Sequence, residues 1–166
     1  MKEYLDRMKK ILHVLASLHG ILIRLCEQKR DALVQVDMQA LNDVIAEEEK
    51  VTSKVHQVEQ ERLRLTGQMH NLFFADQKII SLENMIQYIP EPEKSQLAGL
   101  RSRLLKKVKE LQAVNEVNKS LCEQSLSTVT YYLNVFTSAV SGKNPRYDMH
   151  ARQTKSDHTN LLDRTA

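Results

Sequence analysis

Apolar residues recur along most of this chain at alternating intervals of three and four, the spacing that places side chains on one face of an α-helix. The first run consists of Leu5, Met8, Leu12, Leu15, Leu22, Cys26, Leu33 and Val36. A second row, through Ile11, Leu18 and Leu25, widens the apolar face beyond the narrow seam of a two-stranded coiled coil. The pattern predicts a long first helix with one face in the core of a helical bundle.

Asp37 stands between Val36 and the next apolar run, where its carboxylate can accept hydrogen bonds from the free backbone N–H groups that begin a helix. We expect a kink or a tight turn there. The second run consists of Leu41, Val44, Ile45, Val51, Val55, Val58 and Leu65. Each of the first two helices would be on the order of 50 Å long, so each needs neighbours along most of its length.

The helical pattern weakens after Thr66-Gly67, which predicts a connecting loop before a short amphipathic helix from Ile79 to Ile89. Pro90-Glu91-Pro92 is the clearest helix breaker in the chain, because proline donates no backbone hydrogen bond and disfavours helix in the residue before it. Phe73 and Phe74 are expected to close one end of the bundle, and an exposed docking patch is the alternative.

A third long helix follows the proline break. Its apolar positions are Leu97, Leu100, Leu104, Val108, Leu111, Leu121, Val129, Tyr132 and Phe136. Ser141-Gly142 predicts its end, because glycine suits a left-handed C-terminal cap, and the helix would be about 70 Å long. Residues 143–159 have almost no large apolar side chain, so burial cannot offset the entropy of ordering them. Leu161 and Leu162 near the chain end are a candidate docking element, with a frayed terminus as the alternative.

The composition agrees with long helices, since 166 residues include only four glycines, three prolines and no tryptophan. We therefore predict an all-α fold. The expected architecture is an elongated antiparallel helical bundle of three long helices plus one short helix, with a flexible C-terminal tail. The bundle domain is expected to span residues 1–142, and the disordered tail residues 143–166.

Charge and cysteine content favour a cytoplasmic protein. The net charge of +3 is nearly balanced and does not by itself call for nucleic acid or an anionic membrane. Cys26 and Cys122 form no Cys-x-x-Cys pair and are expected to be buried, reduced thiols. The stretch from Ile11 to Ile23 carries no Asp, Glu, Lys or Arg, but Glu3, Asp6 and the lack of a cleavage site argue against a signal peptide. That stretch is also too short to span a bilayer, so we predict no membrane insertion.

No common phosphate-binding, zinc-protease or nucleophile motif is present. His13 and His19 are six residues apart and face different sides of a helix, so they do not share a metal. His19 is expected to be a hydrogen-bonded histidine in or beside the core. Glu47-Glu48-Glu49 fan around a helix and are expected on a solvated face. We expect no enzymatic activity, no metal and no cofactor.

A basic cluster early in the third long helix is the best candidate for nucleic-acid binding, because charges along a helix can match phosphates. It consists of Arg101, Arg103, Lys106, Lys107 and Lys109. The cluster has no interleaved aromatic residues and no base-reading motif. We therefore expect a surface that is solvated or faces an acidic partner, and no nucleic acid.

Two features later in the same helix indicate recognition. Asn115 and Asn118 lie among apolar positions, where a buried amide must be paired and can set the register between helices. An apolar stripe with the spacing i, i+3, i+4, i+7, i+11 is formed by Val129, Tyr132, Leu133, Phe136 and Val140. If neighbouring helices leave this apolar stripe uncovered, it offers a groove to another amphipathic helix; otherwise it is ordinary core.

The order of these signals resembles the FlgN family of flagellar export chaperones. The resemblance lies in Ala32-Leu33, Asp37, Leu41, Glu48-Glu49-Lys50, Glu59, Arg62, the short helix before the proline break, and Asn115-Glu116-Val117-Asn118. The endings Tyr147-Asp148 and Asp163-Arg164-Thr165-Ala166 are also similar, although no glycine follows shortly after Tyr147-Asp148.

The resemblance implies a cytosolic protein that binds the C-terminal regions of hook–filament junction proteins, prevents their premature assembly and delivers them to the flagellar type III export apparatus. We predict that partners bind by helix-in-groove capture. The predicted partner-binding residues are Asn115, Asn118, Leu126, Val129, Tyr132, Leu133, Phe136, Val140, Leu161 and Leu162. A structural coiled-coil adaptor or self-assembling helical bundle is the main alternative, and a regulatory nucleic-acid binder is the third.

Overall fold

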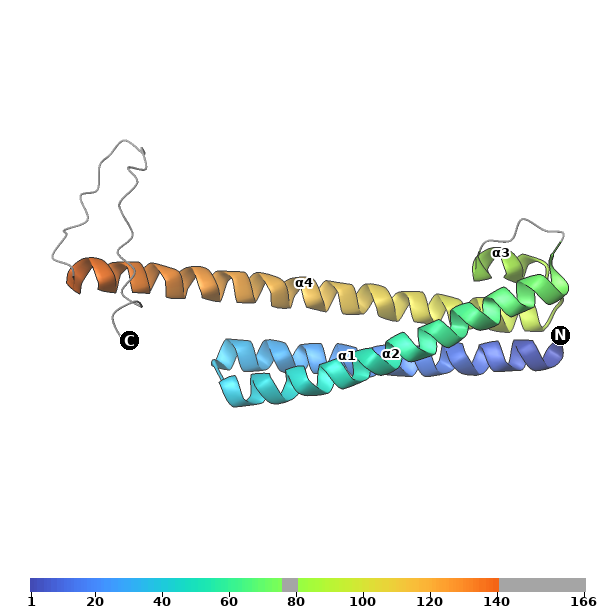
Figure 1. Ribbon diagram of the computed structural model, residues 1–166, viewed down its shortest axis with the longest axis horizontal. Coiled ribbons are helices and arrows are strands. Elements are labelled where there is room, and N and C mark those ends of the chain that lie inside the picture. Colours follow the sequence, from blue (N-terminus) through green and yellow to red (C-terminus); the bar gives the residue numbers. More distant parts are fainter. Residues whose placement is uncertain (76–80, 141–166) are drawn as a thin grey trace, which may run out of the picture. The chain divides into compact units, whose positions relative to one another are not determined.

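The computed structural model describes residues 1–75 and 81–140. They form four helices, α1 (Lys2–Gln35), α2 (Met38–Phe73), α3 (Leu82–Gln87) and α4 (Glu93–Val140) (Figure 1). The predicted all-α class, with three long helices plus one short helix, is confirmed for this part of the chain. Two compact units divide after Leu126, and residues 127–140 are the described part of the second unit. The predicted tail, residues 143–166, lies outside the described residues, so its order stays a prediction.

The turn between α1 and α2 forms at the predicted place. Val36 ends α1 in the left-handed conformation, with φ 57° and ψ 31°. The backbone N–H groups of Val36 and Asp37 bond back to the last turn of α1. Asp37 then caps α2, because its Oδ1 accepts a 3.0 Å hydrogen bond from the backbone N–H of Ala40. A left-handed cap followed at once by an N-cap lets the chain reverse without a loop.

The loop predicted after Thr66-Gly67 is wrong, because α2 continues through this pair to Phe73. A glycine inside a helix costs about 1 kcal/mol relative to alanine. Leu65 and Met69 on either side of Gly67 are both fully buried, so core packing offsets that cost. Thr66 also remains within the helix, where its Oγ1 donates to the carbonyl oxygen of Arg62 at 2.9 Å.

The short helix α3 is shorter than the predicted Ile79 to Ile89 helix. Ser81 caps its start, since Ser81 Oγ accepts a 3.2 Å bond from the backbone N–H of Asn84. Its last helical residue is Gln87, and Ile89 lies in the turn that leads into the proline break. Ile79 lies outside the described residues.

The larger hydrophobic core joins the N-terminal half of α1 to the end of α2, to α3 and to the start of α4. Its buried members include Met8, Leu12, Leu65, Met69, Met85 and Leu97. Phe73 and Phe74 belong to this core, which confirms the prediction that they close one end of the bundle. The Phe73 ring packs edge-on against Tyr4 with centroids 5.5 Å apart, and Phe74 is buried.

Within the first unit, successive long helices run in opposite directions. Figure 1 shows α1 and α2 side by side as an antiparallel hairpin. α4 runs parallel to α1, because Lys9 of α1 bonds to Gln96 near the start of α4 while Cys26 bonds to Asn118 farther along it. A second, smaller core is centred on Leu22, Leu25 and Val51, with Leu111 of α4 packed against it. The predicted antiparallel bundle is therefore confirmed.

By length and composition, α1 is apolar enough to cross a membrane, which corrects the expectation that this region is too short. Its apolar residues nevertheless have partners within the protein. Leu5, Met8 and Leu12 pack in the larger core, and Leu22 and Leu25 pack in the smaller one. The core helix of a folded bundle therefore accounts for this apolar sequence.

Candidate functional site

The apolar stripe at the end of α4 is exposed. Val129, Leu133, Phe136 and Val140 have 54%, 58%, 67% and 70% of their surface accessible. Tyr132, the fifth member, is exposed as well. Exposure of one such residue is ordinary, but a contiguous row of large apolar side chains on one helix face marks an interaction surface. The five side chains are therefore exposed within the described part of the chain, and their role in binding a partner stays a prediction.

The exposed apolar surface is wider than the sequence analysis predicted. Tyr131 and Val135 are also exposed, and the Tyr131 and Tyr132 rings pack against each other with centroids 5.7 Å apart. A groove over this region is lined, among the described residues, by Val129, Tyr132, Leu133, Val135, Phe136 and Ala139. The missed residues carried a signal, because Tyr131 and Val135 are four residues apart and share a helix face.

Leu126 and the chain-end leucines complete the predicted set. Leu126 is exposed on α4 at the end of the first unit. Leu161 and Leu162 lie outside the described residues, so their docking role stays a prediction.

Asn115 and Asn118 lie instead at a polar junction of three helices, formed by Cys26, Lys29, Glu48, Asn115 and Asn118. Asn118 is buried and donates from Nδ2 to the carbonyl oxygen of Cys26 at 2.8 Å. Asn115 is exposed, but its Oδ1 lies 3.2 Å from Cys26 Sγ. Both contacts join α4 to α1. They favour the interpretation in which these amides set the register between helices.

The polar junction also contains a half-buried ion pair. Lys29 of α1 and Glu48 of α2 are 2.5 Å apart, with side chains only 19% and 20% exposed. The expectation that Glu47-Glu48-Glu49 all lie on a solvated face is therefore wrong for Glu48. Helix periodicity could not show this, because Lys29 meets Glu48 only through the α1–α2 hairpin.

The two cysteines differ in their surroundings. Cys26 is fully buried, and burial beside the Glu48 carboxylate raises the pKa of its thiol from 9.0 to about 11. Cys122 is exposed on α4, which corrects the expectation that both thiols are buried. A thiol that stays protonated inside a core is unreactive, so Cys26 serves packing and hydrogen bonding.

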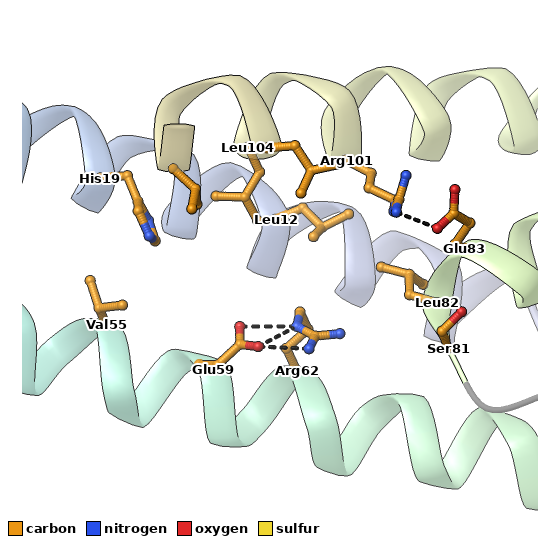
Figure 2. A pocket seen from close by; sticks show the side chains of 12 residues that line it. Leu12, His19, Val55, Glu59, Arg62, Ser81, Leu82, Glu83, Arg101 and Leu104 are labelled. Atoms are coloured by element: carbon orange, nitrogen blue, oxygen red, sulfur yellow. Dashed lines mark hydrogen bonds and ion pairs between the residues drawn. The ribbon is translucent and has the colours of Figure 1, made fainter. Parts of the chain in front are cut away.

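A pocket of about 400 Å³ opens among the helices of the first unit (Figure 2). Apolar side chains including Leu12, Leu82 and Leu104 line it. On the α2 side Arg62 donates to both carboxylate oxygens of Glu59 at 2.6 to 2.9 Å, and on the other side Arg101 of α4 donates to Glu83 at 2.6 Å. Because each lining arginine is paired with a lining glutamate, the pocket offers little net charge to select a ligand.

The lining of this pocket includes two residues that the sequence singled out, His19 and Arg101. His19 lines it and lies with Nδ1 2.8 Å from the carbonyl oxygen of Leu15, which confirms the hydrogen-bonded histidine. Arg101 belongs to the predicted basic cluster. Its ion pair with Glu83 neutralises one of the positive charges that phosphate binding would need. Within residues 1–75 and 81–140, no group of three or more His, Cys, Asp or Glu side chains is arranged to hold a metal ion.

These features describe an all-helical protein, within the described residues, with an exposed apolar face at the end of α4. The sequence matches the family described as FlgN protein over residues 1–155, and the chain therefore belongs to the FlgN family, a family of flagellar chaperones. It is 25% identical over 165 residues to the uncharacterized protein YvyG of Bacillus subtilis (strain 168), covering 99% of this chain and 98% of that protein. No solved structure is significantly similar to it.

Proposed function

We propose that this chain is a cytosolic flagellar export chaperone that binds the C-terminal helical regions of hook–filament junction proteins. In this proposal it prevents their premature assembly and aids their delivery to the export apparatus. The chaperone has no catalytic role of its own. The observation that carries the proposal is the exposed apolar stripe, on a chain that belongs to the FlgN family.

The stripe suits an amphipathic helix as its ligand. Its members recur at three- and four-residue intervals on a helix, so a second helix with the same spacing can interleave its apolar side chains with them. Tyr132 and Phe136 are the largest of these side chains and supply rigid apolar area. A client segment that is otherwise aggregation-prone would cover the stripe and lose its own exposed apolar surface in the same step.

A binding titration with a peptide from the C-terminal region of a junction protein tests the proposal. We expect Tyr132→Asp together with Phe136→Asp to weaken binding at least about tenfold, because two carboxylates would be desolvated in the interface. Both side chains are exposed, so the variant should keep the unfolding midpoint of the parent chain. Undiminished binding by this folded variant would refute the assignment.

Val34→Asp is the matched control. Val34 is as exposed as Phe136 but lies near the end of α1, outside the stripe. The same apolar-to-charged change there should leave client affinity unchanged. If both variants lose binding equally, the loss reflects a general effect of charge and the stripe is not the site.

The coiled-coil adaptor is distinguished by its response to the client. An adaptor or self-assembling bundle forms stable oligomers that persist when the junction-protein peptide is added. The proposed chaperone forms a complex with the peptide, and light scattering detects that complex by its mass.

A further inference from the structure

Four members of the apolar stripe form a seam with the same sequence of intervals from either end of the helix. They are Val129, Leu133, Phe136 and Val140. The intervals are four, three and four residues, which is the heptad spacing of a coiled coil. All four side chains are more than half exposed. Because the spacing is symmetric, the seam of a second copy in antiparallel orientation has the same intervals and can align with this seam residue by residue.

We infer that, when no client is bound, this seam pairs with the seam of a second copy of the chain in antiparallel orientation, and that the client displaces that copy. The inference rests on the proposed function, since it concerns regulation of the same site. In the antiparallel register, Val129 faces Val140 of the second copy and Leu133 faces its Phe136. Every large seam side chain then meets another, and none faces a gap.

The charge pattern also favours a second copy as the occupant. Residues 124–142 contain no Asp, Glu, Lys or Arg, so two copies bring no like charges together along the seam. This uncharged segment is preceded by Glu123. Parallel pairing brings the two Glu123 carboxylates to the same end of the pair, whereas antiparallel pairing places them at opposite ends.

The area available makes this dimer weak. The seam and Tyr132 expose on the order of 600 Å² per copy, so pairing removes at most about 1,200 Å² from water, the lower limit for specific complexes. A weak homotypic contact protects the apolar surface from non-specific association and yields readily to a client that binds more tightly.

Analytical ultracentrifugation of the full chain, in a series reaching high micromolar concentration, tests the pairing. We expect the weight-average mass to rise toward twice the monomer mass, and Phe136→Asp to hold it at the monomer value. Val34→Asp is the matched control, since Val34 is as exposed as Phe136 but lies on α1, outside the seam. A chain that stays monomeric throughout would overturn the inference.

Introduced cysteines test the orientation, in a Cys122→Ser background that removes the exposed native thiol. Under mild oxidation, Val129→Cys and Val140→Cys should each remain uncrosslinked alone and form a disulfide-linked dimer when mixed. Crosslinking within each single variant would overturn the antiparallel register. A double variant, Leu161→Asp with Leu162→Asp, tests whether the chain's own end covers the seam. If this variant dimerises and the parent chain does not, the chain end is the occupant, and the inference is overturned.

Addition of the junction-protein peptide separates this inference from the proposed function. We expect the dimer fraction to fall as the peptide binds, and a dimer that persists with peptide bound would overturn the displacement. If the chain is monomeric and binds the peptide, the inferred pairing is wrong and the proposed chaperone function stands. A dimer that Phe136→Asp disrupts without changing peptide affinity leaves the pairing and removes the stripe as the client site.

Discussion

Asn118 Nδ2 donates a 2.8 Å hydrogen bond to the backbone carbonyl oxygen of Cys26, and both residues are buried. This bond links α4 to α1, and an apolar residue at position 118 could not donate it. Asn118 Oδ1 accepts no hydrogen bond within the described part of the chain. The pair therefore carries a cost in desolvation, and that cost is consistent with a role in setting register.

Asn118→Asp should destabilise the protein by about 3 kcal/mol or more, because a buried carboxylate would lose the donor and face the Cys26 carbonyl oxygen. Urea unfolding monitored by circular dichroism measures the change. Asn42→Asp is the control, since Asn42 is exposed in the first turns of α2, where a negative charge is tolerated. Equal stability of the two variants would show that Asn118 is not held in a dry site.

The half-buried Lys29–Glu48 pair should be coupled more strongly than a surface pair. A double-mutant cycle with Lys29→Met and Glu48→Gln should give a coupling free energy of about 1 to 2 kcal/mol, because both partners are largely removed from water. The Arg7–Glu61 pair has a similar 2.6 Å distance but side chains that are 47% and 42% exposed. Its cycle should give less than about 0.5 kcal/mol. Equal coupling in the two cycles would contradict the difference in burial.

Thiol reactivity should separate the two cysteines. At pH 8, Ellman's reagent should modify the exposed Cys122 rapidly, while Cys26 reacts only at the rate of unfolding, because it is buried and its raised pKa keeps it protonated. Cys122→Ser should therefore abolish the fast phase. Two fast thiols in the folded chain would show that the polar junction opens readily.

The same pKa shift predicts a pH dependence of stability. The unfolded thiol ionises near pH 9.0, while the folded thiol keeps its proton to about pH 11, so the stabilisation is complete below pH 9 and is lost as the pH rises between these values. Urea unfolding across this range measures the slope. Cys26→Ala should have a shallower slope than the parent chain, and Cys122→Ser should not.

Val36→Gly should stabilise the protein by about 0.5 to 1 kcal/mol, because a β-branched residue is strained at φ 57° and glycine is not, even after the larger entropy loss of glycine. Thermal unfolding measures the change. Val34→Gly makes the same substitution at an exposed position inside α1 and should destabilise by about 0.3 to 0.5 kcal/mol, because valine is itself a weaker helix former than alanine. A destabilising Val36→Gly would mean that the left-handed cap is not strained.

Much of the fold follows from local signals. The Asp37 cap, the break at Pro90-Glu91-Pro92 and the course of the third long helix were all predicted at or close to their observed positions. Each depends on interactions within a few residues, so the sequence alone carries the information. The error at Thr66-Gly67 has the opposite origin, since packing of Leu65 and Met69 against other helices overrides the local weakness.

The candidate site shows the same division. The apolar stripe was predicted from helix spacing, but spacing could not show whether Phe136 lies in the core or in solvent. Glu48 and Cys122 were misplaced because their surroundings depend on residues far away in the chain. Asn115 and Asn118 were predicted as amides among apolar positions, and only the first unit's packing shows that both bond to Cys26 and that Asn118 alone is buried.

The sequence by itself determined which segments are helical and which faces of them are apolar, because both properties arise from neighbours three and four residues apart. Only the tertiary structure decided which of those faces are covered. Coverage depends on contacts between distant helices, and it separates Leu12, buried in the core of α1, from Phe136, exposed on α4.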